Sequence, residues 1–280
     1  MDLDFLKNRR TIRRYKKEDI SDELLNELLE AAFRVSNTGN MQVYSVVVTR
    51  DDENKKKLAP AHFNQPSVTN APVILTFCAD FNRFIKWCEF RNAKPGYDNF
   101  QSFFTASIDA LLVAQQFCTA AEAKGLGICY LGTTTYNADQ IIKALELPRF
   151  VVPVTTVTVG YPDGIPEQVE RLPIEAMIHH EHYRDYTRED IDRLYKEKEE
   201  LPANKGFVAE NKKETLAQVF TDVRYTRTNN EHFSDVFLKV IKEQGFKFLV
   251  YRERGTEYSV PLSLYTKITY DFKDCSISST

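Results

Sequence analysis

Apolar residues at helical spacing predict a first amphipathic helix over Ser21–Arg34. Its leucines recur three and four positions apart and therefore fall on one face of a helix; they are Leu24, Leu25, Leu28 and Leu29. Ser21 is suited to cap the first turn, and the acidic residues that follow favour the positive end of the helix dipole.

Short apolar runs rich in β-branched residues predict buried strands. Val43–Thr49, Pro72–Ala79 and Val151–Gly160 have this composition, and Ile128–Leu131 is a shorter run of the same kind. A short helix is expected over Asp51–Ala59, between the first two strands.

The longest periodic segment, Ser102–Lys124, is apolar nearly all round. Such a helix is expected to be buried on most faces, either in the middle of a domain or in a subunit interface. A further helix is expected to begin at Asn137 and to end at Pro148, because proline cannot continue a helix.

Charged segments follow the last predicted strand. They predict helices over Asp190–Glu199, Lys213–Val223 and Asn229–Gln244, with a linker at Pro202–Gly206. The final stretch contains one strand-like piece, Ser263–Tyr270, to which the sequence gives no role.

Composition limits the classes of function. The 37 basic and 40 acidic residues give a net charge of −3, which argues against a surface shaped by nucleic acid or by an anionic membrane. No run of about 18 apolar residues predicts a membrane span. The cysteines are odd in number and form no C-x-x-C pair, which favours the reducing cytoplasm; they are Cys78, Cys88, Cys118, Cys129 and Cys275.

Common nucleotide-binding and hydrolytic motifs are missing. The sequence contains no G-x-G-x-x-G, G-x-x-x-x-G-K-[ST], G-x-S-x-G or H-E-x-x-H. A Rossmann or P-loop mechanism is therefore disfavoured. The run His179-His180-Glu181-His182 offers metal-ligand side chains, but adjacent ligands on one loop rarely reach one tetrahedron, so no metal is expected.

A cluster of arginines precedes the first helix, in the run Arg9-Arg10-Thr11-Ile12-Arg13-Arg14-Tyr15. Guanidinium groups match the geometry of phosphate oxygens, and a threonine hydroxyl adds a further donor. Taken alone, the run is more typical of a solvated basic segment than of a phosphate site.

Three further polar segments have the groups that a flavin ring requires. A flavin needs hydrogen-bond partners along its pyrimidine edge, an apolar contact on one face and a backbone N–H near N5. The segments are Asn37-Thr38-Gly39-Asn40-Met41-Gln42, the loop that contains Gln65, and Tyr130-Leu131-Gly132-Thr133. Each is also compatible with an ordinary surface loop or turn.

The joint order of these pieces resembles the larger, NADPH-preferring branch of the nitroreductase and flavin reductase family. The pieces are N-R-R-T-I-R-R-Y, the leucine-rich helix, N-T-G-N-M-Q, C-A-D-F-N-R, G-L-G-I-C-Y-L-G, L-P, V-G-Y-P-D and R-L-P, between about Leu3 and Gly245. The resemblance implies an α+β fold, with a mainly antiparallel sheet flanked by helices. It also implies an intertwined homodimer with FMN in two interfacial clefts and with the Ser102 helix central to the interface.

The resemblance also implies roles for individual residues. Arg10, Thr11 and Arg171 correspond to phosphate binders, and Arg9 stands where the family often has His. Partners of the isoalloxazine and ribityl groups would be Arg13, Gln42 and Gln65. The loop that touches FMN would contribute Asn37, Thr38 and Asn40. Four residues would pack under the ring and present backbone N–H groups toward N5 and O4: Tyr130, Leu131, Gly132 and Thr133. The chain departs from the family at Thr133, where a second glycine is expected, and at Val169, where a basic residue is expected.

The implied activity is ping-pong hydride transfer from NADPH or NADH through FMN N5 to nitroaromatics, quinones or flavins, with no catalytic residue from the protein. Alternatives are a flavin-binding protein without turnover, reductive dehalogenation or flavin breakdown on the same fold, and a nucleic-acid binder that uses the arginine cluster. The implied division is an FMN-binding domain (1–200), a helical C-terminal arm (201–247) and a tail of unknown role (248–280). The partners would be a second copy and small-molecule acceptors, not nucleic acid or a membrane.

Overall fold

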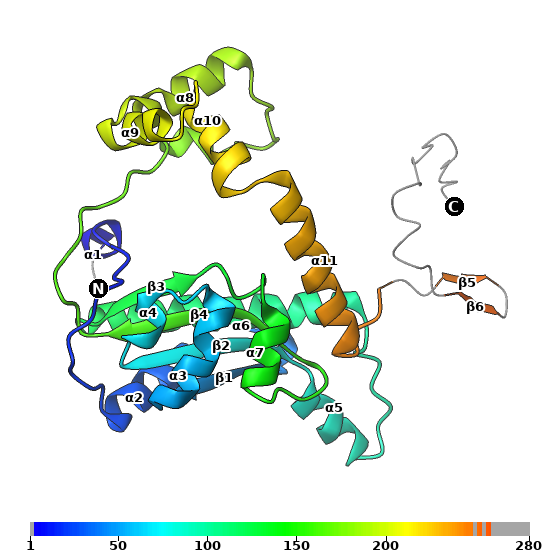
Figure 1. Cartoon of the computed structure of the whole chain (residues 1–280). Helices are drawn as coiled ribbons and strands as arrows, with labels where there is room; N and C mark the ends of the chain where they lie inside the picture. Colours follow the sequence, from blue (N-terminus) through cyan, green and yellow to red (C-terminus); the bar gives the residue numbers. More distant parts are fainter. Residues whose placement is uncertain (1–2, 249–250, 254–255, 259–280) are drawn as a thin grey trace.

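A four-stranded antiparallel sheet forms the centre of the protein. The computed structural model describes residues 3–248, 251–253 and 256–258. The strands β1 (Tyr44–Thr49), β2 (Val73–Asp80), β3 (Gly127–Leu131) and β4 (Val151–Gly160) have the order β1-β2-β4-β3 (Figure 1). All three neighbouring pairs are antiparallel, so the predicted fold class is confirmed.

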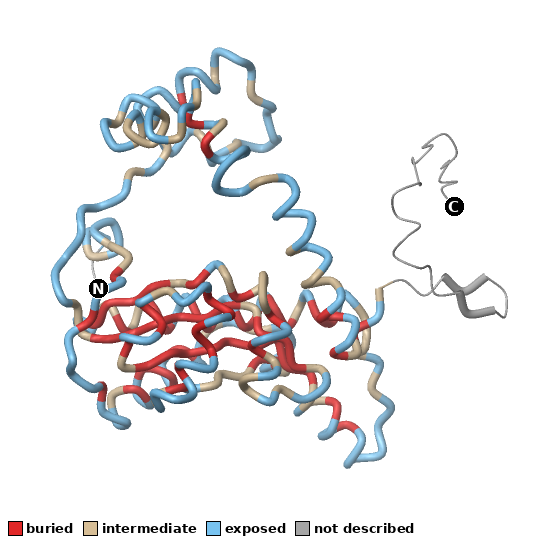
Figure 2. The backbone as a smooth tube through the Cα atoms, in the orientation of Figure 1, coloured by how far each residue is buried: buried red, intermediate tan, exposed pale blue. Residues whose placement is uncertain are grey.

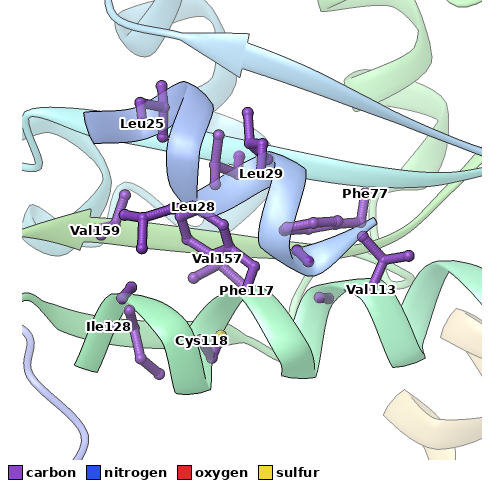
Figure 3. Close-up of a cluster of buried hydrophobic side chains, with 14 of the residues drawn as sticks. Leu25, Leu28, Leu29, Phe77, Val113, Phe117, Cys118, Ile128, Val157 and Val159 are labelled. Carbon is purple, nitrogen blue, oxygen red and sulfur yellow. The ribbon is translucent and has the colours of Figure 1, made fainter. Parts of the chain in front are cut away.

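One face of the sheet is covered by α2 (Asp22–Ala32) and α6 (Phe100–Ala123). As predicted, Ser21 caps α2, and its hydroxyl accepts a hydrogen bond from the Leu24 N–H at 3.2 Å. Figure 3 shows the leucines of α2 in one buried cluster with Phe117 of α6 and with residues of β2 and β4. Burial of these apolar side chains is the main favourable term that holds this layer on the sheet.

The opposite face is covered by shorter helices, α3 (Asp52–Leu58), α4 (Pro66–Thr69) and α7 (Ala138–Ala144). The helix α7 begins where predicted but ends four residues before Pro148. The Asn137 side chain does not cap it; instead its Nδ2 donates to the Ala61 carbonyl at 2.9 Å. This bond ties the start of α7 to the 3-10 turn Ala59–His62. The short helices α1 (Leu3–Lys7) and α5 (Asn82–Glu89) lie outside these layers.

The C-terminal part is a helical arm that leaves the sheet and returns (Figure 1). It contains α8 (Arg188–Glu200), α9 (Pro202–Glu210), α10 (Leu216–Val219), a π-helical turn (Phe220–Arg224) and α11 (Arg227–Glu243). The linker predicted at Pro202–Gly206 is wrong, because these residues are the first turns of α9. Proline is tolerated at the first position of a helix, so Pro202 starts α9 and the break is confined to Leu201.

The helix α11 is exposed over much of its length and buried where it rejoins the core (Figure 2). Val240, Ile241 and Phe246 are buried in the cluster that also contains Phe103 of α6. Nearer the start of α11, Phe233 stacks on Tyr136 with a centroid distance of 4.4 Å. The end of the arm is thus packed as core. The strands β5 (Tyr251–Glu253) and β6 (Thr256–Tyr258) form a separate hairpin, and the strand predicted at Ser263–Tyr270 lies outside the described residues.

The helix α6 is buried on its inner face only. An outward-facing stripe of large apolar side chains is between 41% and 50% exposed; it consists of Phe100, Phe104, Ile108, Leu111 and Leu112. The expected burial on most faces is therefore not reached within a single chain. By length and composition alone α6 is apolar enough to cross a membrane, but its inner face packs against α2 and β2, as in the core helix of a globular domain.

Candidate functional site

The arginine-rich segment lies along the free edge of β3. The Ile12 N–H donates to the Ile128 carbonyl at 3.0 Å, and the Lys16 N–H donates to the Tyr161 carbonyl at 2.9 Å. The Tyr15 hydroxyl lies 2.7 Å from Thr158 Oγ1 on β4. These bonds fix the segment against the end of the sheet and hold Arg10 and its neighbours beside β3.

The arginines of this segment have different partners. Arg9 Nε forms an ion pair with Glu122 Oε1 of α6 at 3.1 Å. Burial raises the pKa of Glu122, and the nearby Arg9 opposes that rise. Arg13 lies beside the Cys129 thiol, whose pKa is raised by burial and lowered by the guanidinium. Arg10 donates from Nη1 to the Asn8 carbonyl at 2.7 Å, whereas its Nε is buried without a partner in the described chain.

The turn after β3 adjoins this segment. Thr134 donates from N–H and hydroxyl to the Leu131 carbonyl at 3.3 and 2.9 Å, and the Tyr136 N–H donates to the Thr133 carbonyl at 3.1 Å. The Tyr130 side chain packs toward α6, and burial raises the pKa of its hydroxyl. Gly132 is left exposed at the start of the turn.

His62 links this turn to the loop that contains Gln65. His62 Nδ1 lies 2.8 Å from Thr133 Oγ1, and the imidazole is fully buried. Burial lowers the pKa of His62 to about 4, so the ring is neutral at pH 7. The Gln65 N–H donates to the His62 carbonyl at 3.2 Å, which places Gln65 next to the turn after β3.

The segment that contains Arg171 reaches the arginine cluster through Gln168. Gln168 Nε2 donates to the Arg9 carbonyl at 3.4 Å. Arg171 donates from Nη1 to the Glu170 carbonyl at 2.9 Å, and Glu170 accepts an ion pair from Lys198 of α8. The structure thus joins the predicted phosphate binders of the N-terminal segment to the chain that carries Arg171.

The loop Asn37–Gln42 is attached elsewhere. The Thr38 N–H and hydroxyl donate to the buried Asp109 carboxylate of α6, at 3.0 and 3.1 Å. The Gln42 N–H donates to Asn37 Oδ1 and its Nε2 to Asn40 Oδ1, both at 3.3 Å. Asn40 and Gln42 have φ near 53°, a left-handed conformation that asparagine tolerates better than most residues. The loop is therefore closed on itself and is held by the Asp109 carboxylate and by Arg83, whose guanidinium donates to the Gln42 carbonyl.

The predicted site residues thus form two groups in one chain. The first group lies around β3 and contains Arg9, Arg10, Thr11, Arg13, Gln65, Tyr130, Leu131, Gly132 and Thr133. The Arg171 guanidinium bonds to the Val169 and Glu170 carbonyls of its own segment, and it is Gln168, three residues earlier, that contacts the first group. The second group is the loop with Asn37, Thr38, Asn40 and Gln42. Their contacts on α6, Glu122 and Asp109, are thirteen positions apart, which corresponds to about 20 Å along a helix.

Sequence reasoning missed three residues that hold these groups in place, His62, Asp109 and Glu122. Asp109 and Glu122 gave a usable signal, since a carboxylate in an otherwise apolar helix requires a partner. His62 gave none, because its partner Thr133 is 71 positions away. In the histidine-rich run His179–His182, where no metal is expected, His179 Nε2 lies 3.2 Å from the Tyr186 hydroxyl. No group of three or more metal-ligating side chains occurs in the described part of the chain.

Comparison with known proteins supplies the family. The Nitroreductase family model matches residues 6–161, which is more than half of the chain. The chain belongs to the nitroreductase family. A curated relative, the FMN reductase [NAD(P)H] of Bacillus subtilis (strain 168), is 34% identical over 180 residues, which cover 64% of this chain and 72% of the relative.

Solved structures share the nitroreductase fold. A protein of Bacteroides fragilis NCTC 9343 described as an oxidoreductase is 65% identical, with a TM-score of 0.86 over 87% of this chain and 99% of that one. The NfrA1 nitroreductase of B. subtilis is 26% identical, with a TM-score of 0.77 over 87% of this chain and 98% of that one. In both cases the shared region extends beyond the family match and into the C-terminal arm.

Proposed function

We propose that this nitroreductase-family chain is an FMN-dependent NAD(P)H oxidoreductase that works as a homodimer. Each flavin site takes the first group of residues from one protomer and the loop Asn37–Gln42 from its partner. Relatives named FMN reductase [NAD(P)H] and oxygen-insensitive NADPH nitroreductase support the reaction class.

The residues beside β3 fit a flavin phosphate. A phosphate group requires several donors and a positive potential, and Arg10 has a buried Nε without a partner in the described chain. Thr11 adjoins it on the same segment, and Arg171 belongs to the segment that Gln168 attaches to Arg9. Arg9 contributes less net charge, because Glu122 already neutralises it. Arg10 is therefore the principal phosphate ligand.

The remaining residues of the first group fit the ring of a flavin. The turn Tyr130–Thr133 offers backbone N–H groups beyond the last strand pairing, Leu131 with Thr156. Gln65 lies beside this turn and supplies an amide, and Arg13 supplies a cation. A positive and donor-rich pocket of this kind stabilises a reduced, anionic flavin.

The apolar stripe of α6 supports a second copy as the partner. Ile108 and Leu112 are more than 40% exposed, and large exposed apolar patches mark interaction surfaces. Asp109, which holds the Thr38 loop, belongs to the same stretch of helix. A partner that packs on the stripe therefore brings its own Thr38 loop toward this helix, which completes a site that one chain leaves divided.

The chemistry requires binding and orientation from the protein. When bound, FMN supplies the ability to accept a hydride from NADPH or NADH and to pass electrons to a nitroaromatic, a quinone or a free flavin. The chain's own residues fix the ring, hold its phosphate and exclude water from one face. No protein acid, base or nucleophile is required, in keeping with a site made of arginines, amides and backbone N–H groups.

The observation that carries the proposal is the placement of Arg10, Thr11 and the Tyr130–Thr133 turn along one edge strand. Its test is an anaerobic visible spectrum of the FMN-loaded protein before and after NADPH, then NADH, then a quinone. Bleaching followed by recovery is expected, and the faster donor gives the preference. Arg10→Ala should weaken FMN binding at least tenfold, whereas the matched variant Arg14→Ala should leave it unchanged. A protein that binds no FMN would overturn the proposal.

A further inference from the structure

A buried histidine supports the one residue of the flavin-binding turn that departs from the family pattern. Thr133 stands where the resemblance predicts a second glycine, and its Oγ1 lies 2.8 Å from His62 Nδ1. The imidazole is completely inaccessible to solvent, and no partner for its Nε2 is present among the described residues. This hydrogen bond therefore connects the Thr133 side chain, at the proposed flavin edge, to a fully buried imidazole.

The surroundings of His62 decide which ring nitrogen carries the proton. A neutral imidazole has one N–H and one acceptor nitrogen. If Nε2 carried the proton, a buried donor would be left without an acceptor, which native proteins rarely tolerate. A buried acceptor nitrogen without a donor costs less free energy than a buried N–H without an acceptor. The proton therefore lies on Nδ1 and is donated to Thr133 Oγ1.

This donation leaves the hydroxyl proton of Thr133 available for another partner. The hydroxyl oxygen accepts from His62, so its own hydrogen points away from the imidazole. The neighbouring N–H groups of Tyr136 and Thr134 are already bonded within the turn, to the carbonyls of Thr133 and Leu131. The hydroxyl is thus set as a directed donor at the end of β3, next to the exposed Gly132.

We propose that His62 is a positioning residue that aims the Thr133 hydroxyl at the N5 and C4=O edge of the flavin. The inference rests on the proposed function, and it adds a side-chain donor where the family pattern has only glycine backbone. A donor at this edge stabilises the negative charge that the flavin ring acquires on reduction. Glycine at position 133 would remove this donor and would also leave both nitrogens of the buried imidazole unpaired.

The test compares Thr133→Val, Thr133→Ser and His62→Phe as FMN-loaded proteins. Two readouts are used, the two-electron midpoint potential and the dissociation constant of sulfite, which adds reversibly at flavin N5. Thr133→Val and His62→Phe should each weaken sulfite binding at least threefold and lower the midpoint potential. A tenfold change in the reduction equilibrium corresponds to about 30 mV. Thr133→Ser keeps the hydroxyl and should match the wild type.

The outcomes separate this inference from the proposed function. If the wild type binds FMN and reacts with NADPH, but Thr133→Val retains wild-type sulfite binding and potential, the positioning role is overturned and the function stands. A wild type that binds no FMN would overturn both. Should His62→Phe fail to fold, the Thr133 series still decides. Nitrogen NMR of His62 gives an independent readout, because protonation at Nε2 would contradict the proposed direction of the hydrogen bond.

Discussion

Gly127 of β3 lies directly against Ile12 of the N-terminal segment. A Cβ added at Gly127 would fall 2.6 Å from Ile12 Cβ, a separation that atoms in proteins do not adopt. The absence of a side chain at position 127 therefore allows the arginine segment to lie flat along the edge strand. Arg10 and Thr11 directly precede Ile12, whose N–H donates to the Ile128 carbonyl, so a shift of Ile12 would move both residues along the edge strand.

Gly127→Ala should displace the segment and weaken FMN binding. Overpacking at a backbone contact typically costs about 1–3 kcal/mol, because Ile12 Cβ cannot move without its main chain. We expect a lower midpoint of thermal unfolding and at least a threefold rise in the FMN dissociation constant. Gly206→Ala, in the middle of α9 with no atom within 4 Å of the added Cβ, is the matched control. It should leave the FMN dissociation constant unchanged and should not lower the unfolding midpoint, because alanine is favoured over glycine inside a helix. Unchanged FMN affinity in Gly127→Ala would show that the segment does not hold the flavin.

Asp109→Ala should release the loop that begins at Asn37. The carboxylate accepts both the N–H and the hydroxyl of Thr38, and loss of buried hydrogen bonds to a charged group costs about 1.5–3 kcal/mol each. Retained FMN should dissociate faster, as measured by flavin fluorescence after dilution. Ser107→Ala removes a hydroxyl that bonds only within α6, to the Phe103 carbonyl, and serves as the control. In a double-mutant cycle with Thr38→Val, additive effects would contradict a direct coupling.

The sequence predicted the sheet and its two main helices because their patterns are local. The leucines of α2 and the β-branched run of β4 each satisfy one periodicity over enough residues to decide the element. The linker at Pro202–Gly206 failed for a physical reason. Proline followed by a nearby glycine suggests a break, but Pro202 occupies the one helical position where its missing N–H costs nothing.

The candidate site could be predicted in composition but not in arrangement. The motif order predicts flavin ligands, including Arg10 and Gln65, through resemblance to a family, and their role stays a prediction. Their division into two groups depends on where Arg9 and Thr38 meet α6, which requires the tertiary structure. The pairing of His62 with Thr133 likewise joins residues whose sequence separation carries no pattern.

The stability of the apoprotein should depend on pH through His62. Burial lowers the folded-state pKa of His62 to about 4 from an ordinary value of 6.5, so between these values the unfolded chain binds the proton and the folded chain does not. This contribution is fully present above pH 6.5 and is lost as the pH falls toward 4, by about 3 kcal/mol. Denaturant unfolding of His62→Phe should show a shallower decline over this range. Parallel declines in the two proteins would contradict a buried neutral imidazole.

Ile108→Glu should convert the protein to a monomer that cannot retain FMN. Ile108 is 42% exposed at the centre of the α6 stripe, so glutamate is tolerated in a single chain but would place a charge in an apolar interface. The arginine group and the Thr38 loop meet α6 about 20 Å apart, and a monomer therefore supplies only half of the proposed site. Light scattering coupled to gel filtration, with the flavin absorbance recorded across the peak, measures both effects together. Phe90→Glu, at the end of α5 and 74% exposed, is the control and should remain a dimer with bound flavin. A monomeric Ile108→Glu protein that keeps its FMN would show that one chain completes the site, and a dimeric one would place the interface on another surface.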